Sequence, residues 1–134
     1  MKYLKSSLLL FLLLFGLGIG SIKAQTHDRL LGTWEIHSKS GGIGGKSNHY
    51  PKGNGNYLIY EKSGDYKNLF GGKISSKGKF TIVSKKSRLT HRIENFIQYH
   101  PGKDLIEYYQ LKADTLFLHS DIPDGFSYSY IRIK

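Results

Sequence analysis

The side chains of this sequence best suited to metal or acid–base chemistry are its histidines and the acidic residues that fall within apolar segments. The six histidines are His27, His37, His49, His91, His100 and His119. None of them lies in a His-x-x-x-His or His-Glu-x-x-His spacing, and the chain has no cysteine to join them. We therefore expect no metal site and no cofactor.

Three polar residues fall on faces that are otherwise apolar. His91 and Asn95 share one face of an alternating segment, and Glu107 shares another with Tyr109. A carboxylate that faces a core must find a partner or water, or take up a proton, and Arg132 and His91 are the candidate partners. The simpler alternatives are a core histidine with satisfied hydrogen bonds and a glutamate that reaches solvent at a strand end.

Signatures of known enzyme classes are missing from the sequence. It has no Gly-x-Ser-x-Gly, no cysteine nucleophile and no acid pair with glycosidase spacing. The stretch from Gly41 to Ser47 is not a phosphate-binding loop, because Ser40 stands at the place of the first glycine and no helix is expected to follow. We predict a non-catalytic protein, and an enzyme that uses Glu107 and His91 is the weakest of three hypotheses.

Alternation of apolar and polar residues, repeated from Thr33 to the end, predicts the elements that position these side chains. The longest such stretch, residues 88–99, predicts one strand. Gly, Pro and Asp turns separate the runs at 63–65, 71–72, 76–78, 101–103 and 123–125. Only residues 26–31 could form a single helical turn. The pattern predicts an all-β domain of about eight or nine strands, closed as an antiparallel up-and-down barrel.

One hairpin predicts which residues share a face. If Ala113-Asp114 is a two-residue turn, Leu111 pairs with Leu116 and Tyr109 pairs with Leu118, because paired residues of an antiparallel ladder lie on the same side. Glu107 then also faces the core. A three-residue turn would shift this register.

A long interruption lies between Lys39 and Asn56, where six glycines occur among Ser, Lys, Asn, His and Pro. Eighteen residues without a hydrophobic period are long for a compact domain, and such segments are often lids. We expect a loop that borders the mouth of the barrel and gates it.

Residues 1–24 have the parts of a cleavable signal peptide. Lys2 and Lys5 precede the apolar run from Leu8 to Phe15, and Ala24 supplies the small residue at the cleavage site. A retained anchor is the alternative, but the run is shorter than the ~20 apolar residues of a membrane span. We expect an exported protein, periplasmic or secreted, with residues 25–134 as one domain. The chain has no cysteine that could carry a lipid anchor after the signal, and we expect no membrane span in the mature form.

Charge does not indicate a nucleic-acid partner. Removal of the signal, which carries Lys2, Lys5 and Lys23 and no acid, lowers the net charge from +10 to +7. The remaining lysines are scattered, whereas nucleic-acid footprints are clustered. A soluble exported protein explains this charge, and the sequence leaves the oligomeric state open.

The segment Leu30-Leu31-Gly32-Thr33-Trp34-Glu35-Ile36 resembles the Gly-x-Trp opening of lipocalins and their bacterial lipocalin-like relatives. The end of the chain, through Tyr128-Ser129-Tyr130-Ile131-Arg132, is similar as well. The resemblance implies that Trp34 plugs one end of a barrel and that Arg132 lies against it, where a guanidinium can stack on an indole. It also implies a ligand inside the barrel.

The leading hypothesis is therefore a carrier of a small, mainly apolar molecule. Its polar contacts would be His91, Asn95 and Glu107. Its apolar lining would be Ile36, Tyr66, Phe70, Phe80, Ile82, Leu89, Ile93, Tyr109, Leu118, Tyr128 and Tyr130. The second hypothesis is a protein- or glycan-interaction module with a filled core, whose contact surface would be Phe96, Tyr108 and Phe117 beside Arg92 and His119.

Overall fold

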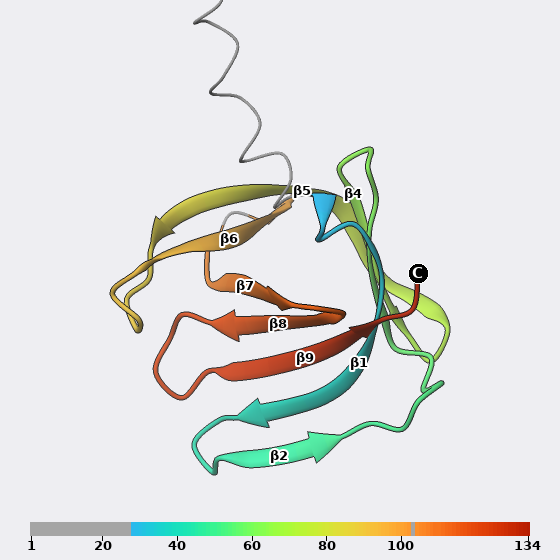
Figure 1. Cartoon of the computed structure of the whole chain (residues 1–134), viewed down its shortest axis with the longest axis horizontal. Helices are drawn as coiled ribbons and strands as arrows, with labels where there is room; N and C mark the ends of the chain where they lie inside the picture. The colour runs from blue at the N-terminus through green and yellow to red at the C-terminus, as the bar shows by residue number, and fades with distance from the viewer. Residues whose placement is uncertain (1–27, 103) are drawn as a thin grey trace, which may run out of the picture.

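The computed structural model describes residues 28–102 and 104–134, so the expected signal peptide and the start of the expected helical turn lie outside the described residues. One turn precedes the first strand, where the Leu31 N–H donates to the Asp28 carbonyl over 3.2 Å. Everything that follows in the described chain is strand and connection (Figure 1). The strands are β1 (Gly32–Gly41), β2 (Lys46–His49), β3 (Tyr57–Tyr60), β4 (Asp65–Phe70), β5 (Lys73–Lys86), β6 (Ile93–His100), β7 (Glu107–Lys112), β8 (Thr115–Ser120) and β9 (Phe126–Arg132).

These strands form a closed antiparallel barrel. Each strand from β3 to β9 pairs with the next one along the chain, and β9 pairs back onto β1. On its other edge β1 has two neighbours: its first half pairs with β3 and its second half with β2. Eight strands therefore close the barrel and β2 is an extra strand, which confirms the predicted all-β antiparallel barrel. Closure removes the exposed edges that an open sheet would leave.

The predicted loop over residues 39–56 is wrong for most of its length. β1 continues to Gly41, turns at residues 42–45 and returns as β2, whose side chains are all exposed. A strand without a buried face needs no apolar alternation, so its sequence carries no hydrophobic period. Only residues 50–56 connect without a strand.

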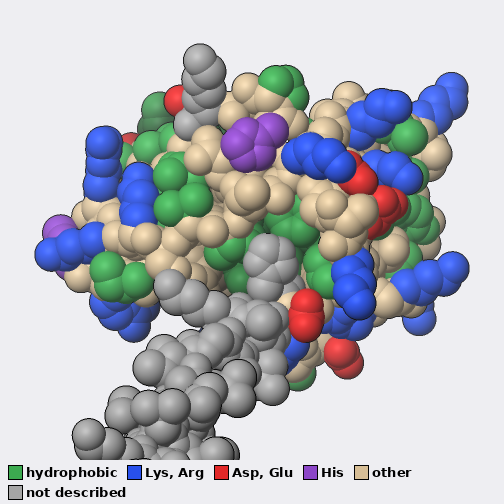
Figure 2. Space-filling view, turned by 90° about the horizontal axis from the view of Figure 1, so that it is seen from above, with side chains coloured by type: hydrophobic (Ala, Val, Ile, Leu, Met, Phe, Trp, Pro, Cys, Tyr) green, Lys and Arg blue, Asp and Glu red, His purple; other side chains and the backbone are tan. Residues whose placement is uncertain are grey.

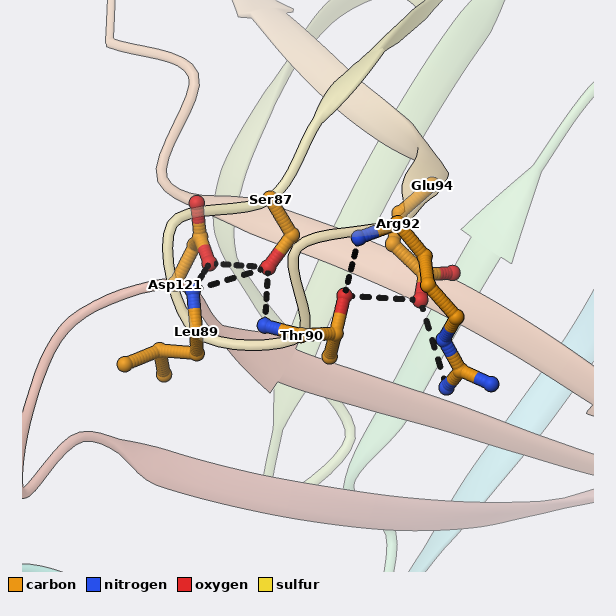
Figure 3. Close-up of polar contacts among 6 residues, drawn as sticks. All are labelled: Ser87, Leu89, Thr90, Arg92, Glu94 and Asp121. Atoms are coloured by element: carbon orange, nitrogen blue, oxygen red, sulfur yellow. Dashed lines mark hydrogen bonds and ion pairs between the residues drawn. The ribbon is translucent and has the colours of Figure 1, made fainter.

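The predicted strand over residues 88–99 is also wrong in its first half. β6 begins at Ile93, and residues 87–92 form a compact turn in which His91 has a positive φ of 58°. Asp121, after β8, holds this turn: its carboxylate accepts hydrogen bonds from the Ser87 hydroxyl at 2.5 Å, drawn in Figure 3, and from the Arg88 N–H at 2.9 Å. The Ser87 hydroxyl oxygen also accepts the Thr90 N–H at 3.0 Å. Polar residues 34 positions apart thus end the strand earlier than local alternation suggests.

Turns were predicted well except at one place. Ala113 and Asp114 form the expected two-residue turn, with Ala113 at a φ of 50° and Lys112 paired with Thr115. The turn predicted at residues 76–78 does not exist, because Gly78 lies inside β5. That glycine serves close packing: a Cβ there would come within 2.1 Å of the His100 carbonyl oxygen on β6. Gly in a strand often marks such a close backbone approach.

The main core fills one end of the barrel. Trp34 is fully buried there, and its indole N–H donates to the Leu30 carbonyl at 2.8 Å. The Arg132 guanidinium lies 4.1 Å from the Trp34 ring centroid and donates to the Leu31 carbonyl at 2.7 Å and to the Arg29 carbonyl. This is the contact that the resemblance implies for the two residues. The buried core consists of Leu30, Trp34, Leu58, Tyr60, Phe80, Ile97, Tyr109, Leu116 and Leu118.

Candidate functional site

The barrel is not filled along its whole interior. A cavity of about 340 Å³ opens beside the main core, and seven of the eight barrel strands contribute to its wall. Its volume lies at the lower end of the range of small-molecule pockets, about 300–1,000 Å³. The lining residues are Leu58, Tyr66, Asn68, Ser76, Tyr99, Glu107, Leu118, Tyr128 and Tyr130.

Alternation along each strand turns these side chains inward. Leu58 on β3 pairs with Asn68 on β4, and Asn68 pairs with Ser76 on β5, so the three share the inner face. On the other side of the barrel Leu118 on β8 pairs with Tyr128 on β9. The cavity wall is therefore a direct product of the strand register.

Two phenols and one carboxyl make a polar chain that starts at Tyr60 in the main core and reaches the cavity wall at Tyr99 and Glu107. The hydroxyl groups of Tyr60 and Tyr99 lie 2.6 Å apart, and the Tyr99 hydroxyl lies 3.5 Å from Glu107 Oε1. Burial raises the pKa of Tyr60 and of Tyr99 well above the ordinary value of a phenol, and the nearby Glu107 raises both further. Both phenols are therefore neutral donors at physiological pH.

Glu107 is the group of this wall whose altered pKa falls close to neutral pH. Burial raises its pKa from an ordinary value of 4.5 to about 7, and the hydrogen bond from Tyr99 offsets only part of that rise. None of the ion pairs among the described residues includes Glu107. The cavity thus holds a carboxyl group that is close to half ionised at neutral pH and has no cationic side chain from the described chain beside it.

Aromatic rings form the rest of the wall. Tyr66 meets Tyr99 edge to face at 4.6 Å between ring centroids, and Tyr128 lies beside Tyr130 at 6.4 Å. Such contacts fix ring orientation as well as burying apolar area. The result is a rigid, partly aromatic surface with polar groups at defined places.

A second hollow, of about 220 Å³, shares Asn68, Tyr128 and Tyr130 with the cavity and forms its mouth. The other residues around the mouth are Ile36, Lys39, Tyr50, Asn56, Tyr57, Leu69, Phe70 and Ser75. Lys39 extends over the aromatic rings there, with Nζ 4.1 Å from the Phe126 centroid and 5.7 Å from that of Tyr128. The mouth therefore carries one positive charge on aromatic faces.

The connection over residues 50–56 borders this mouth but is bound to the barrel. The Gly53 N–H donates to Glu35 Oε1 at 2.9 Å, and the Asn54 amide donates to the Ile36 carbonyl at 2.9 Å. The Gly72 N–H from the β4–β5 turn donates to the Gly55 carbonyl at 2.8 Å. These hydrogen bonds hold the connection in place, which argues against the expected gating loop.

The residues predicted from the sequence to contact a ligand divide into four groups. The cavity wall contains Tyr66, Glu107, Leu118, Tyr128 and Tyr130, and the mouth contains Ile36 and Phe70. Phe80, Ile82 and Tyr109 pack in or against the main core instead. Asn95 accepts a hydrogen bond from the Ser84 hydroxyl at 3.0 Å, away from the cavity. Leu89, His91 and Ile93 are exposed, because the turn at 87–92 takes the place of the expected strand.

Neither Arg132 nor His91, the two partners expected for Glu107, forms an ion pair with it. Arg132 contacts Trp34 at the end of the barrel, and His91 lies on the exposed turn. The Tyr99 hydroxyl donates a hydrogen bond to Glu107 instead. The geometry therefore does not bring Glu107 and His91 together as a catalytic pair.

Five residues of the site were not among the predicted contacts: Leu58, Tyr60, Asn68, Ser76 and Tyr99. Tyr99 shared the alternating face of Ile97, and Asn68 shared that of Tyr66, so their side was readable from the sequence. Leu58 and Tyr60 lie in a run that is apolar on both faces, which gives no orientation. Ser76 was taken for a turn residue.

A larger hollow, of about 630 Å³, lies apart from the cavity and shares no lining residue with it. Its wall includes Glu35, His37, Tyr50, Arg132 and Ile133. Arg132 is held by carbonyls, and Glu35 accepts the Gly53 N–H. Two of its charged side chains, Arg132 and Glu35, already have partners within the chain. The barrel cavity, whose wall includes the carboxyl of Glu107 without an ion pair among the described residues, is the better candidate site.

Residues 28–102 and 104–134 contain no group of three or more metal-ligating side chains. No helix in that part of the chain is long and apolar enough to cross a membrane. Buried side-chain nitrogen and oxygen atoms there all have hydrogen-bond partners. Comparison of the chain with protein-family models, with curated proteins and with solved structures finds no match.

Proposed function

We propose that this protein is an exported, non-catalytic binding protein that holds one small molecule in the barrel cavity. The observation that carries the proposal is the cavity of about 340 Å³ whose wall includes a partly buried carboxyl group. A cavity with a few polar groups among aromatic and apolar side chains is typical of small-molecule sites, where apolar contact supplies affinity and polar groups fix orientation. A lipocalin-like relationship, based on the Gly32-x-Trp34 opening, is part of the same proposal.

The character of the wall refines the expected ligand. Four of its nine residues are tyrosines and two are leucines, while Asn68, Ser76 and Glu107 are polar. A purely apolar molecule would leave the polar groups without partners, at a cost of about 1–3 kcal/mol for each buried group. The ligand that fits therefore has a flat apolar body and at least one polar group.

Export is proposed from residues 1–24 alone, with residues 25–134 as the mature domain. Surface charge fits a small-molecule partner better than a polyanion, since lysine and arginine side chains are spread over the face seen in Figure 2. Periplasmic and secreted locations are both compatible with this proposal.

The alternative, an interaction module with an aromatic contact surface, has less support. Phe96 is fully buried and Tyr108 is 6% exposed, so neither ring is free to meet a partner. Their rings pack on each other at 5.6 Å, and Lys85 Nζ covers Phe96 at 4.8 Å. These rings form a second small core outside the main one, and Phe117 and His119 alone remain partly exposed.

Native mass spectrometry of the mature protein purified from its own host tests the proposal. We expect a mass adduct of one small molecule. In Leu118→Trp the larger side chain fills the cavity, and the adduct should disappear. Phe117→Trp is the matched control, because this neighbour on β8 faces away from the cavity, and it should keep the adduct. Wild-type protein without an adduct, or an adduct that persists in Leu118→Trp with an intact fold by circular dichroism, contradicts the proposal.

A further inference from the structure

We infer that the ligand class of the cavity is a small primary amine on a flat aromatic body, with its ammonium group beside Glu107 and its ring among the tyrosines. The inference rests on the proposed function and specifies the chemistry of that same site. It is drawn from the charge and the ring geometry of the cavity wall.

The first argument is the missing counter-charge. Glu107 lies partly buried in the cavity wall, and the described lysine and arginine side chains form no ion pair with it. A desolvated carboxylate with one long hydrogen bond and no counter-charge is costly, and a ligand ammonium group supplies both the opposite charge and further hydrogen-bond donors. An anionic ligand would add a second negative charge to the same wall.

The second argument is the arrangement of the aromatic rings. Tyr66, Tyr99, Tyr128 and Tyr130 surround the space in front of Glu107. Ring faces attract cations by about 0.5–2 kcal/mol, and more where water is excluded. The mouth already uses this chemistry, since Lys39 Nζ lies over the rings of Phe126 and Tyr128. A wall of one carboxyl and several rings selects cationic molecules with an aromatic body.

The remaining titratable groups around the site leave this charge balance intact. Tyr60, Tyr99 and Tyr130 face Glu107 from β3, β6 and β9, and burial together with the nearby carboxyl raises the pKa of each phenol, so all three stay neutral. Lys39 is the one charged side chain of the mouth and interacts with Phe126 and Tyr128 rather than with the carboxyl. A cationic ligand must pass Lys39 but meets a carboxylate at its destination.

Isothermal titration calorimetry with three probes of similar shape tests the inference. The probes are 2-phenylethylamine, 2-phenylethanol and 3-phenylpropionate. At about pH 8 we expect the amine to bind about tenfold or more tightly than the alcohol, and the acid to bind most weakly. Glu107→Gln keeps the shape of the side chain without its charge and should abolish the preference for the amine. Glu61→Gln, which removes a surface carboxyl paired with Lys67, should leave the preference unchanged.

A second readout separates a charge effect from a change of shape. Binding of the ammonium ion requires ionised Glu107, whose pKa is about 7. The affinity for 2-phenylethylamine should therefore fall about tenfold from pH 8 to pH 6, and at pH 6 binding should release a proton, measured from the dependence of the binding heat on the buffer. The affinity for 2-phenylethanol should not fall in this way, and Glu107→Gln should remove the pH dependence for the amine.

Three results would overturn the inference. If 2-phenylethanol binds as tightly as the amine, or if Glu107→Gln keeps the preference, the cavity binds small molecules without selecting a cation, and the proposed function stands. If none of the three probes binds, an aromatic amine is not the ligand class. The mass adduct and its loss in Leu118→Trp then decide the proposed function separately.

Discussion

The Tyr99 hydroxyl lies 3.5 Å from Glu107 Oε1 and is the hydrogen-bond donor that the structure gives to this carboxyl. One long hydrogen bond replaces only a small part of the hydration that the carboxylate has in water. The pKa of Glu107 accordingly rises to about 7. The site retains a group whose charge is unfavourable for the fold and useful for a ligand.

The raised pKa of Glu107 predicts that ionisation of this carboxyl lowers the free energy of unfolding. The pKa of Glu107 is about 7 in the folded protein and near its ordinary 4.5 in the unfolded chain, so the folded state binds more protons between these values. The free energy of unfolding therefore falls as pH rises from 4.5 to about 7, by up to about 3 kcal/mol. Glu107→Gln should be more stable than wild type at about pH 8 by about 2–3 kcal/mol and nearly equal to it at pH 4.

Urea denaturation followed by the fluorescence of Trp34, the single tryptophan, measures this difference. Glu61→Gln serves as the control for removal of a carboxyl at the surface, and it should show no such gain. Equal stability of Glu107→Gln and wild type at both pH values would mean that Glu107 is solvated in the folded protein.

Asp121 predicts the opposite pH dependence. Burial alone would raise its pKa, but the hydrogen bonds from Ser87, Arg88 and Leu89 lower it below 3.8. A lowered pKa stabilises the fold above the unfolded value, and this contribution is lost as pH falls through the folded value. Asp121→Asn should reduce the free energy of unfolding at neutral pH by about 2–3 kcal/mol, and the loss should shrink as the pH falls below the ordinary value of 3.8.

Asp124→Asn is the matched control, because this exposed residue of the same connection has a positive φ of 54° that asparagine tolerates. It should change stability by less than about 0.5 kcal/mol. Equal effects of the two substitutions in denaturation experiments would show that Asp121 does not hold the turn at residues 87–92.

The alternation of residues along the chain predicted the barrel and the inward orientation of part of the cavity wall. Period-two alternation is a local signal, and the Ala113-Asp114 turn set a register that turned Glu107 and Leu118 inward, as the structure has them. Alternation cannot show where an inner face meets other side chains and where it meets empty space. Phe80 and Tyr66 both face inward, yet one packs in the core and the other lines the cavity.

Two errors have a common cause, which is hydrogen bonding that the side-chain pattern does not show. The strand expected over residues 88–99 is cut short, in spite of its alternation, because Asp121 holds Ser87 in a turn from 34 positions away. The glycine-rich stretch forms β2, without any alternation, because it turns back and pairs with the edge of β1.

The close approach of β5 and β6 at Gly78 predicts that no larger residue fits at this position. A Cβ at this position would lie 2.1 Å from the His100 carbonyl oxygen, a backbone atom that moves only if the two strands separate. Gly78→Ala should therefore destabilise the protein by more than about 3 kcal/mol in urea denaturation. Gly44→Ala is the control, since a Cβ there meets only the Lys46 side chain at 3.8 Å, and it should be tolerated. A mild effect of Gly78→Ala would mean that β5 and β6 are farther apart than the structure shows.

The contacts of Arg132 predict that its guanidinium closes the Trp34 end of the barrel. Its guanidinium lies over the indole at 4.1 Å while its N–H groups reach the Leu31 and Arg29 carbonyls, and a lysine cannot make this planar, forked contact. Arg132→Lys should lower the free energy of unfolding by about 1–3 kcal/mol and shift the Trp34 emission to longer wavelength as water reaches the ring. Arg92→Lys, at an exposed side chain whose ion pair with Glu94 spans 3.7 Å, should do neither. An unchanged emission spectrum in Arg132→Lys would assign the closure to Leu30 and the other apolar neighbours of Trp34, because only a closure that depends on the guanidinium opens when lysine replaces it.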